Sequence, residues 1–145
     1  MPPRKKKAAT VTKPLPWTLT QKQRHTFRIE TEWEMRRDWE RWFFVCSDQH
    51  WDNPHCNREL YKRHLDQAVE RNAGIIMVGD LFCLMQGKYD PRHQKKDVRP
   101  EHDVDDYLDA VIEDCANFHA PYAQNMTVCG MGNHELHIVK RHETN

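Results

Sequence analysis

Three short apolar runs constrain the fold of this chain more than any other feature. They are "FFVCS" at residues 43–47, "IIMV" at 75–78 and "MTVCGM" at 126–131. Runs of this length and composition predict buried strands. The segments between them, 57–72 and 103–118, carry apolar side chains at helical spacing. Apolar strands that alternate with amphipathic helices predict an α/β fold, here a βαβαβ unit with a parallel sheet.

The sequence outside this unit is less regular. Residues 1–16 are rich in proline and lysine and contain few apolar residues, which is typical of disorder. We predict a disordered basic arm over 1–25 and a folded domain over 26–145. The domain begins with a strand at 26–31, where apolar and polar residues alternate. Residues 82–102 lack periodicity and are predicted to be a loop insertion.

Charge and cysteine content narrow the possible classes of protein. The 145 residues include 22 Lys and Arg against 22 Asp and Glu, a formal net charge of zero. Bulk charge therefore does not favour a nucleic-acid or membrane partner. No apolar stretch approaches the length of a membrane span, so no membrane association is expected. The five cysteines include no CxxC pair, which favours reduced thiols and a cytoplasmic location.

A polar cluster follows each predicted strand directly. Asp48 and His50 follow the first strand, Asp80 the second, and Asn133 and His134 the third. Ligands of open α/β sheets bind just beyond the carboxyl ends of the strands. Right-handed crossovers place the three strands side by side with these ends aligned. The fold therefore predicts that the three clusters lie together.

The chemistry of these clusters suits a metal site. Asp48 and His50 are two residues apart, so in extended backbone both point in the same direction. Asp80 has two carboxylate oxygens and can bridge two ions. Mixed oxygen and nitrogen ligands suit Mn, Fe, Zn or similar divalent ions. Gly79 and Gly132 are expected to let the backbone turn sharply and approach a ligand closely.

The ordered set "SDQH", "GD" and "GNHE" resembles the first three motifs of the calcineurin-like metallophosphoesterases. The resemblance covers residues 43–137 and implies part of a β-sandwich flanked by helices, with two divalent metal ions at the strand ends. It implies hydrolysis of phosphate monoesters or diesters, in which the metals activate water and stabilise charge on phosphorus. The implied substrate is a phosphate ester, and nucleic acid is one possible form of it.

The resemblance also implies a role for each site residue. Asp48 and His50 would bind the first metal, Asp80 would bridge both metals, and Asn133 would bind the second. His134 would be the catalytic residue that contacts the substrate phosphate and protonates the leaving oxygen. The next residue in the "GNHE" motif, a glutamate, is not a metal ligand in the family and is expected to be a hydrogen-bonding structural carboxylate.

The chain departs from the family pattern after this motif, since a later metal-binding histidine and a G-H-x-H motif are missing. The second metal would keep only Asp80 and Asn133, and an apolar sheet face would be exposed. We therefore expect an incomplete, N-terminal half of the domain that alone binds at most one divalent ion tightly and hydrolyses phosphodiesters at most slowly. Three interpretations stay open: a truncated frame, half of a split enzyme completed by a complementing C-terminal chain, or a non-catalytic remnant that binds phosphate or nucleic acid.

Two further features bear on the substrate. Trp51 follows His50 directly and either stacks on a substrate base or packs over the rim of the site. The 82–102 insertion follows the second cluster and carries Lys95 and Lys96. These lysines either help to hold an anionic substrate or belong to a solvated surface loop.

The lysine hypothesis makes a prediction about salt. If Lys95 and Lys96 contact an anionic substrate, replacing both with glutamate weakens substrate binding and flattens its dependence on salt concentration. Binding measured by fluorescence anisotropy at several salt concentrations tests this. An unchanged affinity and salt slope would assign both lysines to a solvated loop.

Overall fold

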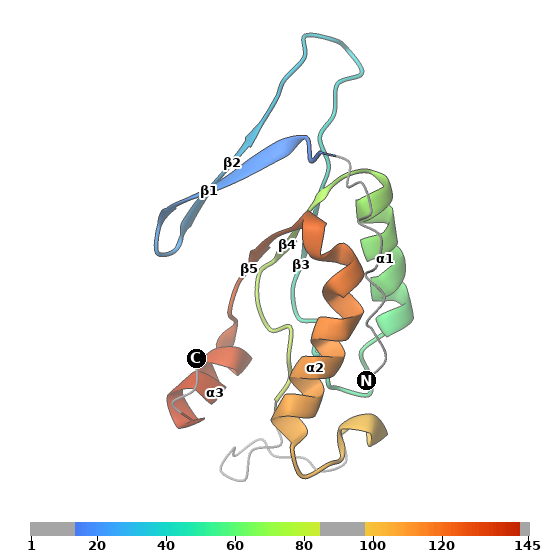
Figure 1. Ribbon diagram of the computed structural model, residues 1–145, viewed down its shortest axis with the longest axis vertical. Coiled ribbons are helices and arrows are strands. Elements are labelled where there is room, and N and C mark those ends of the chain that lie inside the picture. The colour runs from blue at the N-terminus through green and yellow to red at the C-terminus, as the bar shows by residue number, and fades with distance from the viewer. Residues whose placement is uncertain (1–13, 85–97, 143–145) are drawn as a thin grey trace, which may run out of the picture. The chain divides into compact units, whose positions relative to one another are not determined.

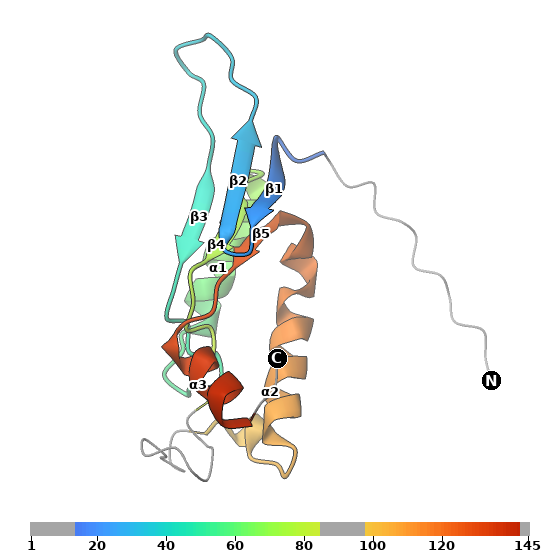
Figure 2. The ribbon, with the colours of Figure 1, turned by 90° about the vertical axis from the view of Figure 1, so that its left-hand side faces the viewer.

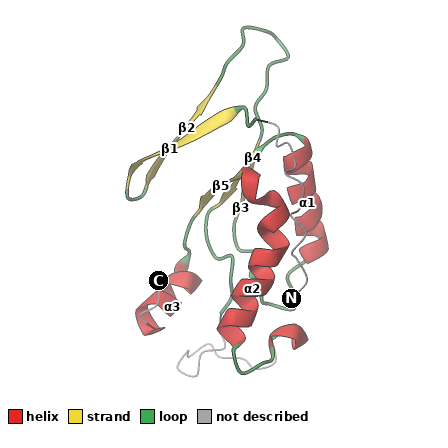
Figure 3. Ribbon diagram, viewed as in Figure 1, coloured by secondary structure: helices red, strands yellow, loops and turns green. Residues whose placement is uncertain are grey.

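The computed structural model describes residues 14–84 and 98–142 of a mixed α/β protein (Figures 1 and 3). The chain forms two compact units, Met1–Glu34 and Met35–Asn145. The described part of the first unit is an antiparallel hairpin of β1 (Trp17–Gln23) and β2 (Thr26–Thr31).

The hairpin confirms the strand predicted at 26–31 but corrects the predicted arm. Residues 17–23 form a strand, so the prediction of disorder up to residue 25 is wrong for them, and residues 1–13 lie outside the described residues. The reason is cross-strand pairing, in which Leu19 lies opposite Ile29. Such pairs stabilise strands whose own sequence is mostly polar.

The second unit contains the predicted βαβαβ arrangement. Strands β3, β4 and β5 pair in parallel, in that order, which confirms the predicted topology. Helix α3 continues the chain beyond the carboxyl end of β5 (Figure 1). The elements are β3 (Phe43–Cys46), α1 (Arg58–Glu70), β4 (Gly74–Met77), α2 (Tyr107–His119), β5 (Met126–Cys129) and α3 (Asn133–His142), with 3₁₀ turns at Pro100–His102 and Ala120–Asn125.

Helix α1 has defined signals at both ends. The side chain of Asn57 accepts a hydrogen bond from the backbone N–H of the third helical residue at 3.0 Å, a cap that contributes about 1 kcal/mol. At the other end Asn72 adopts a left-handed φ of 54°, and Ala73 N–H donates to Ala68 O at 2.8 Å. This Schellman motif closes the helix. Gly74 follows directly and begins β4.

Helix α2 begins later than the sequence predicts. Its N-cap is Asp106, because non-helical residues 103–106 lie between the helix and a separate 3₁₀ turn at 100–102. The described residues of the predicted 82–102 insertion are otherwise irregular, and residues 85–97 lie outside the described part of the chain. Lys95 and Lys96 fall in that range.

Helices α1 and α2 cover one face of the sheet (Figures 1 and 2). The buried cluster joins Leu65 of α1, Val111 of α2 and Ile75 of β4, each fully buried. Alternate strand positions form the other face, where the side chain of Val45 is 60% exposed. Among the described residues, no helix is long and apolar enough to cross a membrane.

Candidate functional site

The pairing of β3 with β4 continues past the ends of both strands. Asp48 N–H donates to Gly79 O at 3.1 Å, and His50 N–H donates to Asp80 O at 3.2 Å. These hydrogen bonds join the polar cluster after β3 to the polar cluster after β4. The predicted convergence of Asp48, His50 and Asp80 at one edge is therefore present in the backbone itself.

Three predicted ligand residues have a left-handed backbone. The φ angles are 58° at Asp48, 46° at His50 and 52° at Asp80. Asp and His adopt this region more readily than most residues, yet each such residue still costs on the order of 1 kcal/mol. The expectation that Asp48 and His50 share a direction through extended backbone is therefore wrong, because turns rather than extended chain aim both side chains.

The two glycines permit close approach of one strand end to another. A Cβ at Gly79, where φ is 152°, would lie 2.6 Å from the backbone nitrogen of Gly132. A Cβ at Gly132 would overlap the Asp80 carboxylate. Both glycines were expected to admit a ligand. In the structure they let the ends of β4 and β5 touch, and this contact brings Asp80 to the start of α3.

A continuous series of contacts links four of the predicted residues. His50 Nε2 lies 4.0 Å from Asp48 Oδ1, and the His50 and His134 rings meet edge to face with centroids 4.8 Å apart. The backbone N–H of His134 donates to Asp80 Oδ1 at 3.0 Å. Asn133 is the exposed first residue of α3, directly before His134.

The two histidines present ring nitrogens that suit a ligand. His134 Nδ1 lies 2.7 Å from Cys83 O. Because a carbonyl only accepts, Nδ1 carries the proton and Nε2 keeps its lone pair. His50 Nδ1 is buried and makes no hydrogen bond within the described part of the chain. Buried polar atoms normally have partners, so this nitrogen is available to an ion or a substrate group.

Glu135 organises this edge, as the sequence led us to expect for that carboxylate. It accepts backbone hydrogen bonds from Gly132 N–H at 2.8 Å, Phe82 N–H at 2.9 Å and Asp80 N–H at 3.2 Å. The Glu135 side chain therefore holds the segment after β4 against the start of α3. These three donors use three of the roughly four lone-pair directions of the carboxylate, which makes Glu135 a poor metal ligand.

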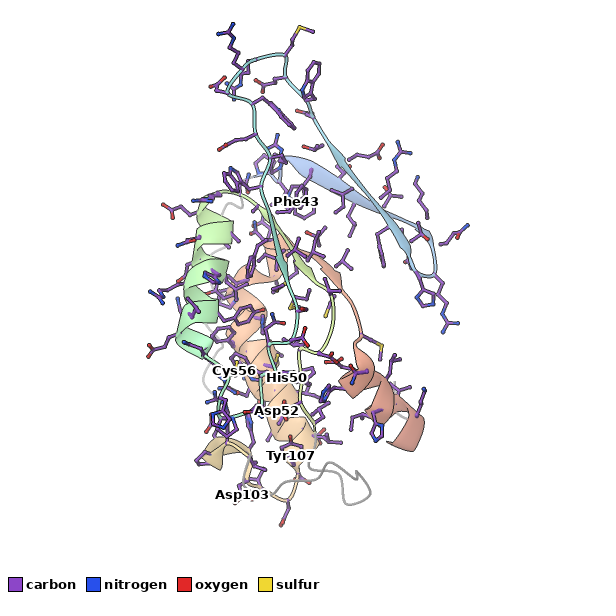
Figure 4. The ribbon with its side chains drawn as sticks, turned by 180° about the vertical axis from the view of Figure 1, so that it is seen from behind. Phe43, His50, Asp52, Cys56, Asp103 and Tyr107 are labelled. Atoms are coloured by element: carbon purple, nitrogen blue, oxygen red, sulfur yellow. The ribbon has the colours of Figure 1, made fainter. Side chains whose placement is uncertain are left out.

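A second carboxylate holds the segment after Asp80. Buried Asp52 accepts from Cys83 N–H at 2.6 Å and Leu84 N–H at 2.9 Å, and also from the hydroxyl of Tyr107. Figure 4 shows His50, Asp52 and Tyr107 together at this end of the unit. Burial, with the neighbouring Asp52 charge, raises the pKa of Tyr107, so this hydroxyl stays a donor.

A groove of about 510 Å³ begins at Asp48 and His50 and runs beside α1. Its walls are half apolar, with Phe44 and Tyr61 beside the exposed His64. Burial raises the pKa of another wall residue, Cys46, to about 11, so that thiol stays protonated at neutral pH. The groove also contains Ser47, Gln49, Asn53, His55, Cys56, Asn57 and Leu60.

Trp51 takes no part in this groove. It is fully buried, its Nε1–H donates to Asp114 Oδ2 at 2.9 Å, and the Arg58 guanidinium lies 3.6 Å from its ring centre. Stacking on a substrate base is therefore wrong, and Trp51 packs in the core. Burial acts to raise the pKa of the Asp114 carboxyl. Hydrogen bonds from His102, Trp51 and Arg58, together with the charge of Arg58, outweigh burial and hold that pKa below its ordinary value.

Sequence reasoning missed two residues near the site, Asp52 and Cys83. Asp52 lies two residues after His50 and Cys83 three after Asp80, so only their closeness to the motifs could have drawn attention to them. The positions of both residues depend on the tertiary contact between the segment after β3 and the segment after β4.

Searches of protein-family models, of curated proteins and of solved structures found no match to this chain.

The Glu135 interactions predict a large loss of stability on truncation. Hydrogen bonds to charged groups contribute about 1.5–3 kcal/mol each. Because they are not additive, we expect Glu135→Ala to lower the free energy of unfolding by about 3 kcal/mol in urea denaturation. The control, Glu113→Ala, removes an exposed carboxylate from α2 and should change it by less than about 0.5 kcal/mol. Equal stability of the two variants would contradict the role given to Glu135.

Proposed function

We propose that the carboxyl edge of the β3–β5 sheet is the active site of a metal-dependent phosphoesterase of the calcineurin-like type. The observation that carries the proposal is the set of left-handed conformations at Asp48, His50 and Asp80. Backbone strain of this kind concentrates at functional sites, where the surrounding structure maintains it. Here it falls on three of the four residues proposed as metal ligands.

The donor set supports divalent metal ions as cofactors. Asp48 and Asp80 supply carboxylate oxygens, His50 an imidazole nitrogen and Asn133 an amide oxygen. Oxygen and nitrogen donors of this mixture suit Mn, Fe or Zn, and the buried, unpartnered Nδ1 of His50 agrees with such a ligand within the described residues. When bound, the ions would lower the pKa of water and neutralise charge on the phosphate.

His134 is proposed to act on the substrate. Its Nδ1–H is engaged by the Cys83 carbonyl, so only Nε2 is available to the site. In the imidazolium form of His134, Nε2 also carries a proton and can donate it to a phosphate oxygen or to the leaving oxygen of the ester. The backbone hydrogen bond from His134 to Asp80 keeps this imidazole beside the proposed bridging carboxylate.

The groove beside Asp48 and His50 is proposed to hold the organic part of the ester. Its volume of about 510 Å³ falls within the range of small-molecule sites. The aromatic rings of Phe44 and Tyr61 and the amides of Asn53 and Asn57 can contact a ring system and its polar edges. Small phosphate esters with an aromatic group are therefore suitable test substrates.

Hydrolysis of bis-p-nitrophenyl phosphate and p-nitrophenyl phosphate tests the proposal. We expect slow hydrolysis of at least one ester that requires Mn²⁺ and is lost on chelation. Asp80→Asn should lower its rate at least about 100-fold, which corresponds to about 2.7 kcal/mol of barrier. The amide oxygen can still accept the His134 N–H, so this substitution removes charge and preserves the backbone contact.

The matched control is Glu113→Gln, which removes one charge from the exposed surface of α2 and should leave the rate unchanged. A rate that is independent of metal, or an Asp80→Asn rate equal to that of the control, would contradict the proposal. Absence of hydrolysis in the unsubstituted protein would contradict it as well.

A further inference from the structure

Three side chains from distant parts of the sequence converge at the edge of the sheet. His50 follows β3, Cys83 follows β4, and His134 lies in the first turn of α3. One ring nitrogen of each histidine and the Cys83 sulfur all lie within 4.8 Å of one another. No spacing pattern in the sequence joins Cys83 to the histidines.

The orientation of His134 suits metal ligation. Its Nδ1–H donates to Cys83 O at 2.7 Å, which leaves Nε2 as the nitrogen with a lone pair. Histidines that bind metals characteristically donate their other ring N–H to a carbonyl or carboxylate in this way. The same hydrogen bond fixes His134 against the residue that supplies the sulfur.

The surroundings of Cys83 also suit a ligand. The Asn53 amide donates to Cys83 Sγ at 3.8 Å, and donors to sulfur favour a metal-bound thiolate over a neutral thiol. The Asp52 carboxylate accepts the Cys83 backbone N–H, which holds the residue in place. Cys83 is only 8% exposed, so little of this residue is open to solvent.

The position of His50 completes the arrangement. Its Nδ1 is buried without a hydrogen-bond partner within the described part of the chain, and its Nε2 lies 4.0 Å from Asp48 Oδ1. If Nδ1 of His50 binds the metal, Asp48 can accept the proton on Nε2. If Nε2 binds the metal instead, Asp48 lies beside the ion. Either arrangement places a carboxylate next to the metal-bound imidazole.

We infer that His50, Cys83 and His134 form a binding site for a single thiophilic divalent ion, of which Zn²⁺ is the best match. One thiolate and two imidazoles are a donor set that Zn²⁺ favours over Mn²⁺ or Mg²⁺. Ligand atoms around tetrahedral zinc lie roughly 3.5 Å apart, so the three side chains close by about 1 Å on binding. Three protein ligands leave one position open.

This inference goes beyond the proposed function and does not depend on it. The phosphoesterase proposal uses His50 for a metal bound by oxygen and nitrogen donors and His134 for the substrate. An ion held by Cys83 would engage both histidines, so the two uses of the site exclude each other in one molecule. Metal binding can be measured without any hydrolysis assay.

Titration of the intact protein with Co²⁺ tests the inference, because cobalt bound to a thiolate gives a near-ultraviolet charge-transfer band. We expect one equivalent of Co²⁺ to produce this band and Zn²⁺ to abolish it by displacement. Cys83→Ser should lose the band and bind Co²⁺ at least about tenfold more weakly. The control, Cys129→Ser, alters an exposed thiol on β5 and should retain both.

A measurement on the unsubstituted protein guards against a variant that fails to fold. Zn²⁺ should slow the alkylation of Cys83 by iodoacetamide and leave the alkylation of Cys129 unchanged. Mass spectrometry of peptides measures both rates. Binding of Co²⁺ without a charge-transfer band, or equal alkylation of Cys83 with and without Zn²⁺, would overturn the inference. A band that persists in a folded Cys83→Ser protein would do the same.

Discussion

The carboxyl edge of the sheet depends on one interaction, the acceptance of three backbone N–H groups by the Glu135 carboxylate. The donors belong to Asp80, Phe82 and Gly132. They come from the turn after β4 and the turn before α3, which the strand pairing alone does not hold together. Without the Glu135 carboxylate, these partly buried N–H groups would lose their partners, at a cost of about 1–3 kcal/mol each. The position of His134 beside Asp80 follows from this interaction.

Local sequence patterns predicted the elements of the second unit well. The apolar runs predicted β3, β4 and β5, and the helical spacing of apolar residues predicted α1 and most of α2. The two kinds of element could be told apart because buried positions recur with different periods in strands and helices. The hairpin strand β1 was missed, since its stability comes from pairing with β2 rather than from its own apolar content. The start of α2 was misplaced because residues 103–106 stay outside the helix and follow a separate 3₁₀ turn at 100–102.

The convergence of the strand-end clusters was predictable from the sequence, but their detailed geometry was not. Strand-end motifs identified Asp48, His50, Asp80 and His134, and parallel topology explains why they lie together. The left-handed turns that aim the first three were not predictable, because they depend on hydrogen bonds between segments far apart in sequence. The position of Cys83 beside the two histidines was missed for the same reason. A thiol so close to two imidazoles would add a soft ligand to the proposed metal site.

His50 belongs to both proposed metal arrangements, so the position of a bound ion relative to this residue tests the central claim most directly. Crystals grown with Mn²⁺ and with Zn²⁺ can be measured at the absorption edge of each metal, and anomalous difference density then locates the ions. We expect a peak within coordination distance of a His50 ring nitrogen, with Cys83 as a further ligand when the ion is Zn²⁺. An ordered protein with no ion at this edge, or with ions bound only at positions remote from His50, would contradict it.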